Sequence, residues 1–255
     1  MDQAPITLIA PDEPRPVTVT NCNGRSPFVI VTDHAGKHQP RGLQMLGLER
    51  AECDRHIAWD IGAGAVSTLM GDALDAIVIR QNYSRLVIDC NRTPGSETSI
   101  VELSELTKVP GNIGLSDDLI GARVREIFRP YHDRIAHELD QRLQASRPTA
   151  LIAVHSFTPV FKDAARPWHV GVLYNRDSRL AVKLIDLLRR EPGLVVGDNE
   201  PYSVSDESDY TIPVHGERRD LPHVAIEIRQ DLIANEAGQQ KWAALLARLL
   251  PHTYQ

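Results

Sequence analysis

The sequence predicts a single three-layer α/β/α domain with a mixed, largely parallel sheet. Strand-like apolar runs alternate with helix-like segments along the whole chain, and no repeat or change of composition divides it. The 255 residues, 42% hydrophobic and 24% charged, suit one globular domain of ordinary composition. We therefore treat residues 1–255 as one domain, with an irregular, proline-containing segment at 1–26.

The first half of the chain predicts buried strands and one helix. Residues 27–32 form a continuous apolar run that ends at Asp33-His34-Ala35-Gly36, where small residues allow a turn and leave the imidazole open. Residues 37–52 are predicted to be mostly loop. Asp54 is a suitable N-cap for a helix that reaches about residue 70. Strands are then expected at 75–79 and at 86–88.

The second half begins with a long connection at 93–118, rich in Pro, Gly, Ser and Thr, of the kind that often carries a binding function. Helical spacing of apolar residues predicts a helix over 119–143, which Pro130 should break or kink. Further strands are expected at 150–154, 168–174, 194–196 and 222–229. Helices are expected at 178–190 and 235–250, and residues 198–220 form a polar segment.

Charge and composition exclude several classes of function. A net charge of -6 and the absence of a Lys/Arg run argue against a nucleic-acid surface, so an anionic substrate would need a local basic pocket. Three irregularly spaced cysteines fit neither a disulfide framework nor a cysteine-based zinc site. The first residues lack the pattern of a signal peptide, and the apolar runs are too short to span a membrane. We expect a cytoplasmic protein whose partner is a small molecule.

Four polar groups follow or end apolar strands: His34, the cluster 89–92, His155 and Glu227. Each alone has an ordinary explanation, such as a structural histidine or a solvated charge. Together they are harder to dismiss, because sites in such sheets form at the carboxyl ends of strands.

Two histidines and a carboxylate make a catalytic zinc site with one open position. Glu227 could then take a proton from water, an arginine could steady the oxyanion, and Asn91 with Arg92 could bind a substrate carboxylate. The HExxH, Gly-x-Ser-x-Gly, Walker and GxGxxG motifs are absent.

Five stretches in this order resemble the N-formylglutamate amidohydrolase family. That family is similar in fold to the zinc carboxypeptidases and the aspartoacylase-like deacylases, so the resemblance implies a phosphorylase/hydrolase-like α/β/α fold and a single zinc ion. The match runs from about residue 28 to the C-terminus. The stretches are Asp33-His34-Ala35-Gly36, Asp54-Arg55-His56, Arg85 with Asp89-Cys90-Asn91-Arg92, His155-Ser156-Phe157-Thr158-Pro159, and Ile226-Glu227-Ile228-Arg229-Gln230-Asp231-Leu232.

The resemblance implies that His34 and His155 are the imidazole ligands of the zinc ion. The carboxypeptidase-like pattern places an acidic ligand three residues after the first histidine, but Lys37 stands there. We take Asp54, at the predicted helix N-cap, as the third ligand. His56 and Asp60 are the alternatives.

The resemblance also implies roles around the substrate. Asn91 and Arg92 match a pair that holds the substrate carboxylate, and Arg229 could add a second contact. Arg85 is expected to polarise the scissile carbonyl, and Glu227 to act as the general base.

The implied activity is hydrolysis of an N-formyl amino acid, N-formyl-L-glutamate first among them, to formate and the free amino acid. One alternative is a zinc deacylase or carboxypeptidase acting on another N-acyl amino acid or a peptide. A different class of alternative is a non-catalytic carboxylate-binding or zinc-sensing protein on the same scaffold.

Overall fold

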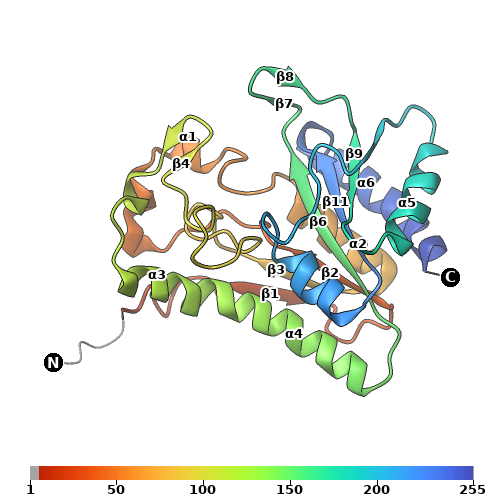
Figure 1. Ribbon diagram of the computed structural model, residues 1–255, viewed down its shortest axis with the longest axis horizontal. Helices are drawn as coiled ribbons and strands as arrows, with labels where there is room; N and C mark the ends of the chain where they lie inside the picture. Colours follow the sequence, from red (N-terminus) through yellow and green to blue (C-terminus); the bar gives the residue numbers. More distant parts are fainter. Residues whose placement is uncertain (1–5, 255) are drawn as a thin grey trace.

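The computed structural model describes residues 6–254, within which seven strands form a central sheet (Figure 1). Their order across the sheet is β1-β3-β2-β6-β11-β9-β10. The outer pair β1–β3 and the pair β9–β11 are antiparallel and the other pairs are parallel, so the predicted mixed, largely parallel sheet is confirmed. The strands are β1 (Val17–Thr20), β2 (Phe28–Thr32), β3 (Ile77–Gln81), β6 (Ala150–Phe157), β9 (Val170–Leu173), β10 (Val196–Asp198) and β11 (His223–Arg229).

Helices cover both faces of this sheet, as the alternation along β2 illustrates. Phe28 and Ile30 join the core shared with α2 (Ala63–Leu74), α5 (Arg179–Arg189) and α6 (Glu236–Leu249). Val29 and Val31 join the opposite core, which includes α4 (Arg129–Gln144). Successive strand residues point to opposite faces, so a continuous apolar strand is the pattern that a doubly covered sheet requires. The predicted three-layer arrangement is thereby confirmed.

The predicted helix at 119–143 is continuous past Pro130. It consists of α3 (Asp117–Arg123), a π-helical turn (Val124–Phe128) and α4. The widened turn ends at Phe128, two residues before Pro130. Proline lacks the N–H that an ordinary helical turn would use at this point, and the wider turn lets the helix continue. The other predicted strands and helices from residue 150 onward lie within three residues of their observed ends.

The segment around Asp54 differs from the prediction. A single helical turn, α1 (Arg50–Cys53), ends at Asp54, and α2 begins only at Ala63. Gly62 precedes α2 with φ 82°, and a Cβ there would lie 2.2 Å from the Ile233 carbonyl oxygen. Residues 54–62 therefore form turns instead of the first turns of a helix.

Residues 86–88 are not a strand, contrary to the prediction. They lie in buried turns, with Leu86 and Val87 in the α4-side core. Asn112 Nδ2 donates to the Leu86 carbonyl at 2.9 Å, and Arg123 Nη1 to that of Val87 at 2.8 Å. Two polar side chains distant in sequence thus supply the hydrogen bonds that these buried carbonyl groups would receive from a neighbouring strand in a sheet.

Shorter elements complete residues 6–254. Residues 1–26, predicted to be irregular, contain the edge strand β1. Residues 1–5 of this segment lie outside the described part. None of the helices in the described part is both long and apolar enough to cross a membrane. The remaining elements are the hairpins β4–β5 (Leu103–Ser104, Thr107–Lys108) and β7–β8 (Val160–Phe161, Ala164–Ala165), the 3-10 helices Arg41–Gly47, Pro110–Asn112, Glu217–Arg219, Gln230–Leu232 and Leu250–Thr253, and the π-helical turn Ile212–Gly216.

Candidate active site

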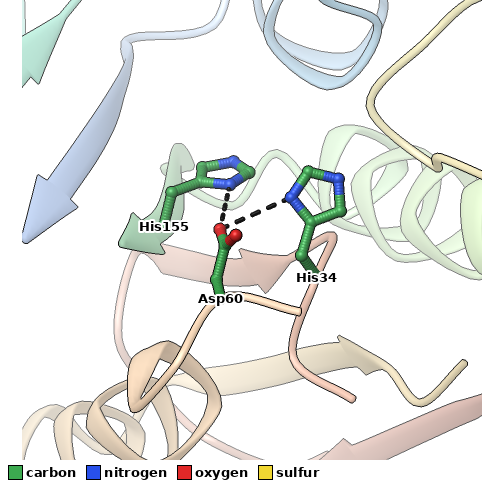
Figure 2. A group of neighbouring side chains, drawn as sticks. All are labelled: His34, Asp60 and His155. Atoms are coloured by element: carbon green, nitrogen blue, oxygen red, sulfur yellow. Dashed lines mark hydrogen bonds and ion pairs between the residues drawn. The ribbon is translucent and has the colours of Figure 1, made fainter. Parts of the chain in front are cut away.

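Two histidines and an aspartate meet at the carboxyl edge of the central strands (Figure 2). His34 follows β2, and His155 lies in the adjacent parallel strand β6. Asp60 comes from the turn before α2, where its backbone N–H donates to the His34 carbonyl at 2.9 Å. All three side chains are buried. The parallel pairing of β2 and β6 therefore brings together residues more than a hundred positions apart.

The three side chains present a compact set of ligand atoms. Asp60 Oδ2 lies 2.9 Å from His155 Nδ1 and 3.4 Å from His34 Nδ1, and one ligand atom from each residue falls within 4.8 Å of the others. Two imidazoles and one carboxylate, with a position left for water or substrate, are the donor set of catalytic zinc sites. His34, Asp60 and His155 could thus hold a metal ion.

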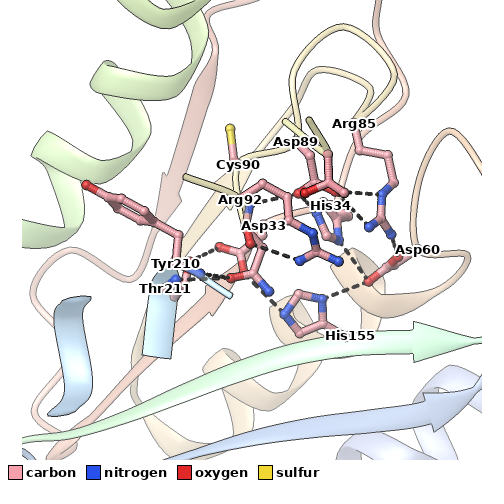
Figure 3. Close-up of polar contacts among 12 residues, drawn as sticks. Asp33, His34, Asp60, Arg85, Asp89, Cys90, Arg92, His155, Tyr210 and Thr211 are labelled. Carbon is pink, nitrogen blue, oxygen red and sulfur yellow. Dashed lines mark hydrogen bonds and ion pairs between the residues drawn. The ribbon is translucent and has the colours of Figure 1, made fainter. Parts of the chain in front are cut away.

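The second nitrogen of each histidine faces its own buried carboxylate (Figure 3). His34 Nε2 lies 2.7 Å from Asp89 Oδ1, and His155 Nε2 lies 3.1 Å from Asp33 Oδ2. Metal-ligating histidines usually donate their other N–H to such a group, which fixes the ring and leaves the first nitrogen free for the metal. The carboxylates beside the second nitrogens are thus compatible with a metal ion at the first ones.

The charges of the cluster depend on one another. Burial and Arg85 oppose protonation of His34, but Asp89 and Asp60 outweigh them and raise its pKa. Burial also opposes protonation of His155, whose pKa is raised by Asp33 and Asp60. The pKa of Asp60 is lowered despite burial, because both imidazoles lie beside it. Without a metal, the site therefore favours imidazolium–carboxylate pairs.

Glu227 lies next to this cluster on β11. Its partner in the parallel register with β6 is His155, and its side chain lines the same cavity. Glu227 is buried, and its Oε2 atom has no hydrogen-bond partner among the described residues. Burial, with the nearby Asp60, raises its pKa to about 7, against the opposing influence of His155. A carboxyl group whose pKa is about 7, with a free oxygen beside residues that could hold a metal ion, suits a general base.

Arg85 links the His34–Asp60–His155 cluster to Asp89. Its Nη2 and Nε atoms donate to Asp89 Oδ2 at 2.7 and 3.1 Å, and its Nη1 lies 3.4 Å from Asp60 Oδ1. The guanidinium therefore lies beside the His34–Asp60–His155 cluster, where it could stabilise negative charge on an oxygen atom.

Two cavities meet around these residues, with volumes of about 590 and 240 Å³. The larger one contains His34, His155 and Glu227, whereas the smaller one has an apolar part that includes Leu86 and Phe157. A substrate beside the His34–Asp60–His155 cluster could thus extend into either cavity. The side chains that line both cavities are those of Asp60, Arg85, Arg92, Ser156 and Tyr202.

The predicted carboxylate-binding residues are in different situations. Arg92 lines both cavities and donates to the Asn91 carbonyl at 2.9 Å, and no carboxylate in the described part of the chain pairs with it. The Asn91 side chain is occupied by the loop at 209–211: it donates to Asp209 at 2.9 Å and accepts two backbone N–H groups at 3.0 Å. Arg229 pairs with Asp231 at 2.8 Å and lines neither cavity.

Asp54, the expected third ligand, does not reach the histidines. It pairs with Lys37 at 2.5 Å, and its side chain is 46% exposed. His56, one alternative, pairs with Glu105 at 3.0 Å. Asp60, the other alternative, is the acid in the cluster, because α2 begins later than predicted and leaves Asp60 in the turn beside His34.

Sequence reasoning assigned no role to Asp33, Asp89 or Tyr202. Asp33 directly precedes His34, and Asp89 opens the cluster 89–92, so these neighbours are the signal that points to them. Tyr202 lies in the polar segment 198–220 and gives no such signal. Its position depends on Gly171 and Gly197, paired residues of β9 and β10 where a Cβ would lie 2.0 and 2.5 Å from the Glu200 carbonyl oxygen.

The chain is similar to one known protein family and to proteins of known structure. Residues 26–234 match the model of the family described as N-formylglutamate amidohydrolase. The crystal structure of gene product Atu2144 from Agrobacterium tumefaciens is similar, with 34% identity, a TM-score of 0.93, and coverage of 96% of this chain and 97% of that one. N-formylglutamate amidohydrolase from Ralstonia eutropha JMP134 shares the fold at 17% identity and a TM-score of 0.67, covering 93% of this chain and 97% of its own. No curated protein matches the chain.

Proposed function

The chain belongs to the N-formylglutamate amidohydrolase family, and on this premise we propose that it is a zinc-dependent enzyme that removes the formyl group from an N-formyl amino acid. N-formyl-L-glutamate is the first substrate to test, and the products are formate and the free amino acid. Membership makes the chain a hydrolase that acts on amides. The observation that carries the finer proposal is the buried His34–Asp60–His155 set with Glu227 beside it.

The metal would be held by His34 Nδ1, His155 Nδ1 and a carboxylate oxygen of Asp60. When bound, a zinc ion supplies Lewis-acid polarisation of the scissile carbonyl and makes water acidic enough to lose a proton near neutral pH. We propose zinc because two imidazoles and one carboxylate are the donor set of catalytic zinc sites.

The remaining steps belong to the side chains. Arg92 binds the substrate carboxylate, since it lines both cavities without a carboxylate partner of its own in the described part. Arg85 donates to the carbonyl oxygen as negative charge develops there. Glu227 accepts the proton of the attacking water on its free oxygen, then passes it to the leaving amine.

The size of the larger cavity is compatible with a second candidate, a deacylase acting on a bulkier N-acyl amino acid. A formyl group has only two non-hydrogen atoms, whereas about 590 Å³ is within the range of sites that hold whole small molecules. The cavity must also accommodate the amino-acid part, so its volume alone does not separate the two candidates.

A panel of N-formyl, N-acetyl and N-succinyl amino acids, assayed with the zinc-loaded protein, tests the proposal. Release of the free amine is expected from the N-formyl compounds, with N-formyl-L-glutamate first, and should stop when the metal is chelated. Faster release from acetyl or succinyl compounds would favour the second candidate. Bound zinc with no hydrolysis across the panel would instead favour a carboxylate-binding or zinc-sensing protein.

A further inference from the structure

Four side chains of the site form a closed ring of contacts (Figure 3). His34 contacts Asp89, Asp89 contacts Arg85, Arg85 contacts Asp60, and Asp60 returns to His34. The shortest two of these contacts, both 2.7 Å, are made by Asp89. Asp89 thus lies between a metal ligand and the arginine that faces the reacting carbonyl.

Both oxygens of Asp89 accept hydrogen bonds. Oδ1 accepts from His34 Nε2 at 2.7 Å and from the Asn91 backbone N–H at 2.8 Å. Oδ2 accepts from Arg85 Nη2 and Nε at 2.7 and 3.1 Å. A guanidinium and a backbone N–H can only donate, and His34 must donate from Nε2 if Nδ1 is to bind a metal. Asp89 is buried, and it is the acceptor for both His34 and Arg85, so this position needs an acceptor on both sides.

Asp33 has a similar place beside His155 but different partners. Its Oδ1 accepts from the hydroxyls of Tyr131 and Thr211 at 2.8 and 2.7 Å, and its Oδ2 faces His155 Nε2. Hydroxyls can accept as well as donate, so an amide at position 33 could keep its oxygen toward His155 and direct its NH₂ group at them. Asparagine should therefore be tolerated better at 33 than at 89.

We propose that Asp89 is a positioning residue that holds the metal ligand His34 and Arg85 in one arrangement, and that it does so because only a carboxylate accepts on both sides. This inference rests on the proposed function, because it takes a metal at His34 and a substrate carbonyl at Arg85. An amide at 89 can satisfy one side only. Its oxygen should stay with His34 and the Asn91 N–H, which are buried and fixed, while Arg85, whose side chain is 26% exposed, moves away.

Zinc affinity tests the hold on His34. It is measured by competition with a chelator for the wild type, Asp89→Ala, Asp89→Asn and Asp33→Asn. Asp89→Ala should lose about 10- to 100-fold in zinc affinity, as other outer partners of metal ligands do. Both asparagine variants should stay within about tenfold of the wild type, since each keeps an acceptor for its histidine. Wild-type affinity in a folded Asp89→Ala variant would overturn the proposal.

A double-mutant cycle tests the hold on Arg85. Asp89→Asn and Arg85→Gln should each lower kcat by a similar factor, and the double variant should be no slower than either single one, because the same contact is lost. Asp33→Asn combined with Arg85→Gln is the matched control, in which the two effects should multiply. Multiplying effects in the Asp89→Asn/Arg85→Gln pair would contradict the proposal.

Two further measurements keep the test decisive. Arg85→Lys retains the charge but offers one nitrogen in place of the Nε and Nη2 pair, so its kcat should fall nearly as far as that of Arg85→Gln. A lysine variant as fast as the wild type would count against positioning by Asp89, even if the Asp89 variants do not fold. If the wild-type protein hydrolyses no N-acyl amino acid, the proposed function fails, whereas the zinc affinities still decide whether Asp89 holds His34.

Discussion

At the residue scale, the free oxygen of Glu227 gives the first prediction. Glu227→Gln keeps the size of the side chain but removes its ability to accept a proton, so kcat should fall about 10²- to 10⁴-fold. Zinc affinity should change little, since Glu227 is not among the three ligand residues. Steady-state kinetics and metal analysis of the same preparation measure both quantities. Near-normal turnover in this variant would remove Glu227 from the role of base.

The two arginines of the cavities should differ in their kinetic effects. Arg92→Ala should mainly raise KM, by about 10- to 100-fold, because a hydrogen bond to a charged group contributes about 1.5–3 kcal/mol. Arg85→Ala should mainly lower kcat, by about 10²- to 10³-fold, because its contact strengthens as the carbonyl oxygen gains charge. Kinetics over a wide range of substrate concentration separate the two constants. Equal effects on both constants in both variants would mean that these roles are wrongly divided.

Some of the site could be predicted from individual residues and some could not. His34 follows β2, and His155 and Glu227 lie near the carboxyl ends of β6 and β11, so the parallel sheet brings them to one edge whatever the loops do. The sequence predicts Asp54 as a ligand because an aspartate before a helical pattern is a good N-cap. Here it ends a short helix instead, and Asp60 reaches the histidines through a turn that no local signal predicts.

At the element scale, the buried strands were the most predictable feature. Five- to eight-residue apolar runs such as β2 and β6 can be buried on both faces only inside a covered sheet. The three-residue run at 86–88 is too short for this argument. Its backbone is satisfied by Asn112 and Arg123, whose contribution depends on long-range packing and leaves no periodic signal.

The start of α2 gives a prediction for an element. Gly62→Ala should lower the free energy of unfolding by about 1–3 kcal/mol, because the new Cβ would lie 2.2 Å from the Ile233 carbonyl oxygen at positive φ. The shift should also move Asp60, two residues earlier, and weaken zinc binding.

Gly121→Ala in α3 is the matched control for that variant. Beyond its chain neighbours and the backbone of α3, no described atom lies within 4 Å of the added methyl group. This substitution should therefore leave zinc binding unchanged and stabilise the helix by up to about 1 kcal/mol. Thermal unfolding and chelator competition measure the two effects. Unchanged zinc affinity in Gly62→Ala would show that the turn does not position Asp60.

At the scale of the whole molecule, the sheet and the charges of the site have opposite effects on stability. The strands β2, β6 and β11 are parallel neighbours at the centre of the sheet, so their carboxyl ends are held by apolar packing on both faces. That rigid edge carries four buried carboxyl groups, Asp33, Asp60, Asp89 and Glu227, around two imidazoles. Only Arg85 and the protonated histidines balance the negative charge of these carboxyl groups in the metal-free site, and burying that charge is costly. A bound metal ion should therefore stabilise the entire fold.

The size of that stabilisation should depend on pH. In the metal-free protein the pKa values of His34 and His155 are raised above 6.5. Their contribution to stability is therefore fully present below pH 6.5 and is lost as the pH rises through the raised values. Zinc must displace the same protons, so its affinity should increase over this range. Zinc should consequently raise Tm more at about pH 8 than at about pH 6.

Thermal unfolding with and without zinc at both pH values measures this difference. The same zinc concentration, about 100-fold above the Kd at pH 8, is used at both pH values. At pH 8 this gives about 2.7 kcal/mol of stabilisation, which corresponds to a rise in Tm of about 5–10 °C for a domain of this size. Asp60→Asn should lose most of the rise at both pH values, because it removes a charged ligand. Asp54→Asn, which changes an exposed carboxylate bound to Lys37, should keep it. An equal rise at both pH values would show that His34 and His155 are not the groups that zinc deprotonates, and loss of the rise in Asp54→Asn would restore Asp54 as a ligand.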